Sequence, residues 1–238
     1  MPEESAENLR IVTIDGPAGC GKSTVVRGLV ERFRESGVLA VGFSTGQVYR
    51  GLTWLVLERG IDPEDVAAVR SLATEVQVQV LLREGELRLE FNGLDPGSEL
   101  YSDRVTESIH WISDDGDVRA AMLPLQRALS VEGGVILAEG RDLGTVVYPD
   151  AAVKVFLTAQ LEERARRRHA EFRDQLGEEI SLESVIEKVA RRDDHDANRQ
   201  VSPLRPADDA IVIDTTDQTP EQVVTTIFDQ IPVSWFPA

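Results

Sequence analysis

The sequence is poor in the side chains that build disulfides and metal centres. It has one cysteine and three histidines among 238 residues. The single cysteine, Cys20, excludes a disulfide within the chain and is typical of a reducing compartment. The histidines, at positions 110, 169 and 195, have no partner at the spacing of metal ligands. We therefore expect no structural metal site.

Positive charge is also scarce. The chain has 25 Lys and Arg residues against 42 Asp and Glu residues, which gives a formal net charge of −17. Because nucleic-acid binding depends on a basic surface, nucleic acid is not expected as a partner. The charge is typical of a well-solvated surface. Only Lys22, Lys154 and Lys188 are lysines, so a lysine in a motif stands out.

Long apolar segments are missing as well. No run approaches the roughly 20 residues that a membrane-spanning helix needs. The stretch Met1–Arg10 is acidic and polar and lacks the apolar region of a secretory signal. These features predict a cytoplasmic protein without a membrane partner.

Five short apolar runs alternate with helical patterns, which is typical of an α/β fold with a parallel sheet. Apolar residues make up 42% of the chain, enough for a buried core. The expected strands are 11–14, 38–43, 135–138, 153–157 and 211–214. The expected helical segments are 22–36, 47–59, a short one starting at Pro63, 102–131, 161–176, 182–193 and a last one, capped by Thr219, that runs to about 230.

A different pattern begins at residue 75. Polar and apolar residues alternate in 75–81 and again in 86–91, with Arg83-Glu84-Gly85 between them. Alternation with period two on both sides of a glycine-bearing turn predicts an antiparallel hairpin with one wet face. Such a hairpin does not belong inside a parallel sheet, so we interpret residues 74–98 as an insertion.

The motif with the clearest chemistry lies between the first strand and the first helix. Residues 16–23 read Gly-Pro-Ala-Gly-Cys-Gly-Lys-Ser, the spacing G-x-x-x-x-G-K-S of a phosphate-binding P-loop. Glycines let successive N–H groups point at one anion, and the helix adds its positive end. Lys22 is expected on the β/γ-phosphates and Ser23 on Mg²⁺. The alternative, a glycine-rich turn that happens to hold a lysine, fits the two flanks poorly.

Two further clusters follow buried strands, where ligands gather in α/β sheets. Thr45-Gly46-x-x-Tyr49-Arg50 offers a guanidinium for a phosphate, or else a plain surface arginine. Gly140-Arg141-Asp142 places a cation beside an anion at a strand end, which is costly unless each has a partner. Arg141 suits a second phosphate, Asp142 an exocyclic amine of a base, and Glu139 a position near Mg²⁺. A solvated turn is the alternative.

Arginines also flank residues 169–190. Arg164, Arg166, Arg167 and Arg168 lie on one expected helix, and Arg191, Arg192 and Arg199 lie further along the chain. Positions 192, 196 and 199 share a helical face. Two such clusters predict a lid that closes on phosphates and stabilises a transferring phosphoryl group. The alternative is ordinary salt bridging on a solvated helix.

Taken together, these motifs resemble bacterial cytidylate kinases, which belong to the nucleoside monophosphate kinase group. The likeness covers roughly residues 11–230 and rests on 14–23, on Thr45-Gly46 with Tyr49-Arg50, on Gly140-Arg141-Asp142-Leu143-Gly144-Thr145-Val146-Val147, on Arg192-Asp193 through Arg199, and on Pro203-Leu204 with Pro206-Ala207. It implies an α/β P-loop kinase fold with a five-stranded parallel sheet flanked by helices.

The resemblance also implies a division of the chain. A single kinase domain, 1–238, would comprise a core (11–43, 132–160 and 204–231), a monophosphate-binding region (44–131) with the β insertion at about 74–98, and a lid region (161–203). The implied reaction is phosphoryl transfer from ATP to CMP or dCMP with Mg²⁺, by a monomer.

Site residues follow from the matched positions. ATP would be held by Gly16, Gly19, Cys20, Gly21, Lys22, Ser23 and Thr24. The acceptor would be held by Thr45, Gly46, Tyr49, Arg50, His110, Arg119, Arg141, Asp142 and Asp196. In these roles Arg50 and Arg141 bind the acceptor phosphate, Arg119 and Asp142 read cytosine, and Arg192 and Asp196 contact the sugar. Arg199 would contact the transferring phosphate, so that Lys22, Arg141, Arg192 and Arg199 serve catalysis.

The chain departs from the family pattern in the acceptor half. The family usually has Asp at Ser44 and Ala at Gln47, commonly Arg at Tyr101, a base-contacting Ser at His110, and Pro at Asp117. These departures leave open a related P-loop kinase with a different nucleotide-like acceptor, such as a paralogue in a specialised pathway. A nucleotide-binding regulator without turnover is a third hypothesis, which the presence of Lys22, Arg141 and Arg199 disfavours. No N-K-x-D motif of a GTPase is present.

Overall fold

The computed structural model describes residues 10–83, 86–128, 134–173 and 180–237. The expected polar tail 1–9, the hairpin turn at 84–85 and the end of the helix expected at 161–176 lie outside these ranges. The chain divides into two compact units, one formed by residues 1–40 with 133–238 and the other by residues 41–132. Within the described residues, no helix is both long enough and apolar enough to cross a membrane.

The first unit is built on a five-stranded sheet in the order β2-β5-β1-β6-β7, as expected for the fold class. Its strands are β1 (Arg10–Asp15), β2 (Ala40–Ser44), β5 (Val135–Gly140), β6 (Val153–Thr158) and β7 (Ile211–Asp214). β1 is central and pairs in parallel with β5 and β6, and β6 pairs in parallel with β7. The carboxyl ends of these strands therefore meet at one edge of the sheet. β2 begins two residues later than expected and contains the boundary between the two units.

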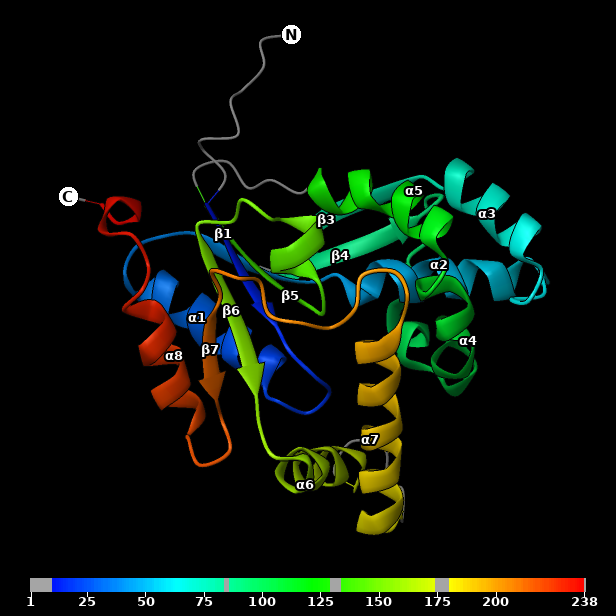
Figure 1. Cartoon of the computed structure of the whole chain (residues 1–238). Helices are drawn as coiled ribbons and strands as arrows, with labels where there is room; N and C mark the ends of the chain where they lie inside the picture. Colours follow the sequence, from blue (N-terminus) through cyan, green and yellow to red (C-terminus); the bar gives the residue numbers. More distant parts are fainter. Residues whose placement is uncertain (1–9, 84–85, 129–133, 174–179, 238) are drawn as a thin grey trace, which may run out of the picture. The chain divides into compact units, whose positions relative to one another are not determined.

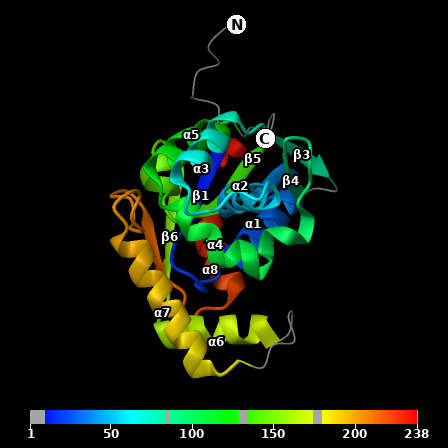
Figure 2. The same ribbon diagram turned by 90° about the vertical axis from the view of Figure 1, so that its right-hand side faces the viewer.

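Four helices accompany these strands: α1 (Lys22–Glu35), α6 (Leu161–Glu171), α7 (Leu182–Asn198) and α8 (Pro220–Phe228). A one-turn helix, η3 (Leu143–Val147), follows β5. α1 packs against α8, and the rings of Phe33, Phe228 and Phe236 contact one another there. In Figure 1 the arrowheads of β6 and β7 point toward the end of the sheet where α6 lies, and both figures show α6 packed against α7 (Figures 1 and 2).

Helix ends in this unit follow their sequence signals. Thr219 caps α8 with the complete capping box that the sequence predicts, since its side chain and that of Gln222 each bind the other residue's N–H. Ser181 caps α7. α7 runs five residues beyond the predicted end at 193, so the stretch from Arg192 to Asn198 is helical.

The second unit contains α2 (Gly46–Glu58), α3 (Val66–Glu75), β3 (Val78–Arg83), β4 (Glu86–Phe91), a 3₁₀ turn η2 (Gly97–Tyr101), α4 (Asp103–Ser113) and α5 (Gly116–Arg127). The antiparallel pairing of β3 with β4 is confirmed, with Val78 opposite Phe91.

Two predicted boundaries in this unit are wrong. The short helix does not start at Pro63 but at Val66, because the Asp65 side chain accepts from the N–H of Ala68 and caps it there. α3 then continues to Glu75, so the first hairpin strand begins at Val78 and not at residue 75. Despite its period-two pattern, residue 75 belongs to the last turn of the preceding helix, and residues 76 and 77 link that helix to the strand.

Close contact between α2 and β4 depends on a glycine. A Cβ atom built on Gly51 would lie 1.8 Å from Cζ and 1.9 Å from Cε2 of Phe91, whose ring is fully buried. Such distances are impossible without moving one of the two elements. Gly51 therefore lets the hairpin approach the helix.

We expect Gly51→Ala to lower the free energy of unfolding by about 1–3 kcal/mol through overpacking. The helix propensity of alanine, about 1 kcal/mol better than that of glycine, offsets part of this loss. Urea unfolding followed by circular dichroism measures it. Gly46→Ala in the same helix is the matched control, because its Cβ would meet the Ser44 hydroxyl at an ordinary 3.6 Å. Equal stability of the two variants would contradict this packing.

Candidate active site

The P-loop spans the gap between β1 and α1, with Asp15 ending the strand and Lys22 beginning the helix. This confirms the order strand, loop, helix. Gly19 has φ of +76°, and a Cβ there would lie 2.7 Å from the carbonyl oxygen of Arg164 on α6. Gly16 has φ of +150° and no room for a Cβ beside the Leu157 carbonyl. The loop conformation thus requires glycine at both positions.

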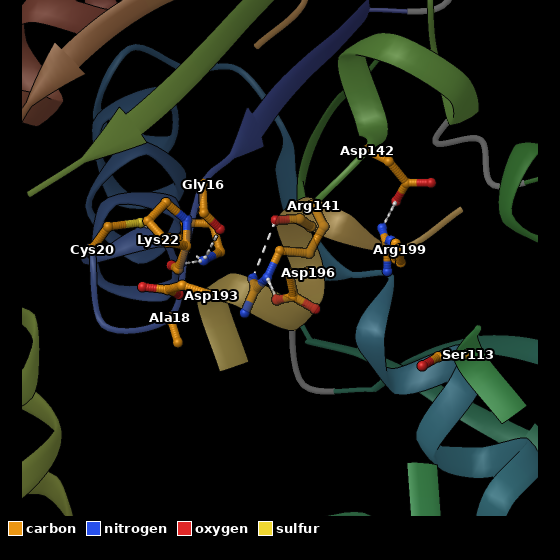
Figure 3. A network of polar contacts seen from close by, with 12 residues as sticks. Gly16, Ala18, Cys20, Lys22, Ser113, Arg141, Asp142, Asp193, Asp196 and Arg199 are labelled. Atoms are coloured by element: carbon orange, nitrogen blue, oxygen red, sulfur yellow. Dashed lines mark hydrogen bonds and ion pairs between the residues drawn. The ribbon is translucent and has the colours of Figure 1, made fainter. Parts of the chain in front are cut away.

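The ammonium group of Lys22 lies over its own loop. Its Nζ donates to the carbonyl oxygens of Gly16, at 2.8 Å, and Pro17, at 2.7 Å (Figure 3). Burial and the neighbouring Arg141 guanidinium lower the pKa of Lys22 to about 8. Its hydrogen bonds to oxygen are thus made to neutral carbonyls, which phosphate oxygens can replace.

Ser23 faces the end of β5. Its hydroxyl lies 2.9 Å from each carboxylate oxygen of Glu139. A hydroxyl and a carboxylate are hard oxygen donors of the kind that Mg²⁺ accepts beside substrate phosphates. These two residues therefore fit the magnesium position expected from the sequence. Thr24 is exposed in the first turn of α1.

Arg141 and Asp196 form an ion pair between the end of β5 and α7. The Nε of Arg141 donates to Oδ2 of Asp196 at 2.8 Å, and both side chains are largely buried (Figure 3). Burial opposes ionisation of both groups, but the opposite charge of the partner favours it and outweighs the effect of burial. The pKa of Arg141 is raised by Asp196, and the pKa of Asp196 is lowered by Arg141 with help from Arg192 and Arg199. The pair thus stays ionised.

Asp142 and Arg199 form a second, looser pair in the same unit. Arg199 follows α7 directly, and its Nη2 lies 3.8 Å from Oδ1 of Asp142 (Figure 3). Both side chains are less than a tenth exposed. Arg192, one turn before Asp196, is exposed. This unit therefore brings Arg141, Asp142, Asp196 and Arg199 into two adjoining ion pairs, so that the neighbouring charges of Arg141 and Asp142 each have a partner.

Asp15 is a site residue to which the sequence reasoning gave no role. Its two carboxylate oxygens accept from the N–H groups of Leu143, at 2.9 Å, and Gly144, at 2.8 Å. Burial raises the pKa of Asp15 to about 6, although these two bonds and Lys22 lower it. The sequence contains a signal for Asp15, because it is an acidic residue directly after an apolar run, as Glu139 is.

In the second unit, Arg50 is held by several neighbours. Its Nη1 donates to the carbonyl of Leu100 at 2.9 Å and to the hydroxyl of Thr106 at 3.0 Å. Its guanidinium lies 5.3 Å from the centre of the Tyr101 ring. The Tyr101 hydroxyl accepts from Nε2 of Gln47 at 3.1 Å. Two positions that depart from the expected family pattern, 47 and 101, therefore contact each other, and one of them, Tyr101, contacts Arg50.

Other predicted acceptor residues gather in this unit as well. Arg119 is buried, with its guanidinium 5.0 Å from the centre of the Tyr49 ring and its Nη1 donating to the Ser113 carbonyl at 3.0 Å. His110 is exposed on α4, one turn after Thr106, and its ring contacts that of Trp111 at a tilt of 39°. Thr45 and Gly46 form the start of α2.

Three arginines of α6 form salt bridges along their own helix, as the salt-bridge interpretation expects: Arg166 and Arg167 with Glu163, and Arg168 with Glu171. Arg167 also reaches Thr215, the residue after β7, and Arg164 reaches the P-loop.

Comparison with known families decides what this arrangement is. A family model described as cytidylate kinase matches residues 12–233. The chain belongs to the cytidylate kinase family. It is 44% identical over 224 residues to the cytidylate kinase of Mycobacterium avium, covering 93% of this chain and 94% of that one. It is 39% identical to the cytidylate kinase of Halalkalibacterium halodurans, covering 92% of this chain and 96% of that one.

Another relative is longer. The bifunctional pantoate ligase/cytidylate kinase of Synechocystis is 40% identical over 223 residues, but the chain spans only 42% of that protein's length. Among solved structures, shikimate kinase from Acinetobacter baumannii matches at 14% identity and a TM-score of 0.40, covering 97% of both chains. The fold is therefore assigned from the strand order of the sheet and from the family, and not from this likeness.

We expect ATP to bind the free protein more weakly as the pH rises above about 8, because Lys22 is a cation below its pKa of about 8 and neutral above it. Bound phosphates raise that pKa, so binding at about pH 9 should take up a proton. Calorimetric titration with ATP between about pH 7 and pH 9, in buffers of different ionisation enthalpy, measures both effects. Lys22→Met should bind weakly at every pH. Wild-type affinity independent of pH would contradict the assignment.

Proposed function

We infer that the protein is a cytidylate kinase that transfers the γ-phosphoryl group of ATP to a phosphate oxygen of CMP and releases ADP and CDP. The observation that carries this inference is identity of 39–44% to cytidylate kinases over more than nine-tenths of both chains. The P-loop with Lys22 and Ser23 supplies the donor site that such a reaction needs.

Catalysis rests on position and charge. Phosphoryl transfer needs no covalent intermediate with the protein, so the chain's work is to align two nucleotides and neutralise their oxygens. Lys22 gives up its bonds to Gly16 and Pro17 and turns to the β/γ-phosphates. Burial has already removed most of the solvation of Lys22, which lowers its pKa, so little more is lost on the way, and the bound anion raises the pKa again.

Roles for the ion-paired residues of the first unit follow from their chemistry. Arg141 offers a preformed guanidinium for the acceptor phosphate, since Asp196 occupies only its Nε side. Asp142 accepts the exocyclic amine of cytosine. Asp196 and Arg192 contact the sugar, and Arg199 the transferring phosphate.

In the second unit, we assign Arg50 to the acceptor phosphate and Arg119 to the base, with Thr45, Gly46, Tyr49 and His110 around them. Arg119 is fixed by the Tyr49 ring and the Ser113 carbonyl, which leaves it preorganised. The contact of Gln47 with Tyr101 beside Arg50 is the feature that favours a second candidate, a kinase with a different nucleotide-like acceptor.

Mg²⁺ is part of this proposal. Ser23 and Glu139 would hold it, directly or through water, and it would neutralise charge on the phosphates. The Ser23 hydroxyl donates its proton to Glu139, which leaves its oxygen lone pairs for the ion.

A coupled assay of ADP release with ATP, Mg²⁺ and a panel of CMP, dCMP, UMP, AMP and GMP tests the function. We expect turnover with CMP and dCMP, much less with the others, and none after the metal is chelated. Lys22→Ala should lower kcat by orders of magnitude. Turnover with none of the five acceptors would reject the cytidylate kinase assignment and favour the second candidate.

We expect Asp142→Ala to raise KM for CMP roughly tenfold to a hundredfold, because a base amine loses its buried acceptor. KM for ATP should change little, and the preference for CMP over UMP should fall. Steady-state kinetics with both acceptors measure this. Asp229→Ala, at the exposed end of α8, is the control. An unchanged KM for CMP would refute the base-reading role.

A further inference from the structure

The carbonyl groups of the P-loop are held from outside by side chains that are distant in sequence. Nη1 of Arg164 donates to the carbonyl of Ala18 at 3.2 Å. The hydroxyl of Thr215 donates to the carbonyl of Cys20 at 3.1 Å. These two partners lie 146 and 195 positions away along the chain. Both contacts lie within the first unit.

The geometry of the peptide bond fixes the direction of the N–H groups that follow these two carbonyls. In a planar trans peptide the C=O of one residue and the N–H of the next point in opposite directions. Holding the Ala18 carbonyl therefore directs the N–H of Gly19 away from α6. Holding the Cys20 carbonyl likewise directs the N–H of Gly21 away from Thr215. A loop that binds phosphate needs its amides turned inward in this way.

The Thr215 hydroxyl has a defined proton direction. Nη1 of Arg167 donates to this hydroxyl at 3.0 Å, and Nη2 donates to the Thr215 carbonyl at 2.7 Å. Since a guanidinium has no acceptor, the hydroxyl must accept from Arg167 and give its own proton to Cys20. Thr215 is only 3% exposed, so water does not substitute readily for either partner.

Arg164 is likewise held by several partners. Its Nε donates to the carbonyl of Ala159 at 2.8 Å, and its Nη1 also pairs with the carboxylate of Asp193 on α7. The side chain is 7% exposed. One guanidinium thus joins the P-loop, the end of β6 and α7 in a fixed geometry that a lysine could not reproduce.

We propose that Arg164 and Thr215 are positioning residues that hold the P-loop in its phosphate-binding form, with Arg167 orienting the Thr215 hydroxyl. They act through the loop backbone and touch no nucleotide in this role. α6 is thereby a determinant of ATP affinity and not of acceptor affinity. The inference rests on the proposed binding of ATP at this loop.

Thr215 provides the sharper test, because valine removes only the hydroxyl and serine restores it. We expect Thr215→Val to raise the dissociation constant for ATP roughly threefold to tenfold, the effect of one lost hydrogen bond. The dissociation constant for CMP should be unchanged, and Thr215→Ser should bind ATP like the wild type. Calorimetry on the full chain measures both ligands.

Two further variants separate positioning from general packing. Thr226→Val makes the same change at an exposed position of α8, where the hydroxyl donates to the carbonyl of Gln222, and should leave ATP affinity unchanged. Arg167→Met should weaken ATP binding in the same direction as Thr215→Val, because it frees the hydroxyl to rotate.

The outcomes distinguish the two proposals. Wild-type affinity for ATP in Thr215→Val would overturn the positioning role and leave the kinase assignment intact. Equal loss of ATP and CMP affinity, or loss in Thr215→Ser as large as in Thr215→Val, would also overturn it by showing a general structural defect. Absence of ATP binding in the wild type would overturn the proposed function and this inference together.

Discussion

The carboxylate of Asp15 is the constraint on which the first unit's site depends. It ends the central strand, immediately before the P-loop, and binds the N–H groups of Leu143 and Gly144. The loop that carries Arg141 and Asp142 is therefore tied to the strand that carries the phosphate loop. Burying this charge is unfavourable, as the pKa of about 6 shows. The two amides offset that cost only in this one arrangement of the two loops.

Around this tie, the P-loop separates its acceptors from its donors. Carbonyls of Gly16 and Pro17 bind Lys22, that of Ala18 binds Arg164, and that of Cys20 binds Thr215. The negative ends of the loop's peptide dipoles are thus covered by cations and a hydroxyl. The positive ends remain for an anion. Only Lys22 is placed to leave its carbonyls, because Arg164 and Thr215 are locked by further partners.

Much of this could be predicted from the sequence, because it depends on local patterns. The five strands, the P-loop and the capping box of α8 follow from apolar runs, glycine spacing and the pair Thr219 and Gln222. The start of α3 was missed because Asp65 caps a helix more effectively than Pro63 starts one. The position of Asp15 after an apolar strand could have marked it, but the partners of Asp15, Arg164 and Thr215 could not be derived, since each contact joins segments more than a hundred positions apart.

Contacts made by backbone groups and contacts made by side chains differ in how much they depend on the sequence. The carbonyl of Cys20 binds Thr215 through the backbone, a contact that any residue at this position could make. Arg50, in contrast, is surrounded by side chains, including the Tyr101 ring with its bond to Gln47. A departure there changes what a guanidinium touches, and a second departure makes contact with the first. Phosphate recognition through backbone groups, as proposed for the P-loop, does not depend on side-chain identity, whereas recognition through Arg50 does.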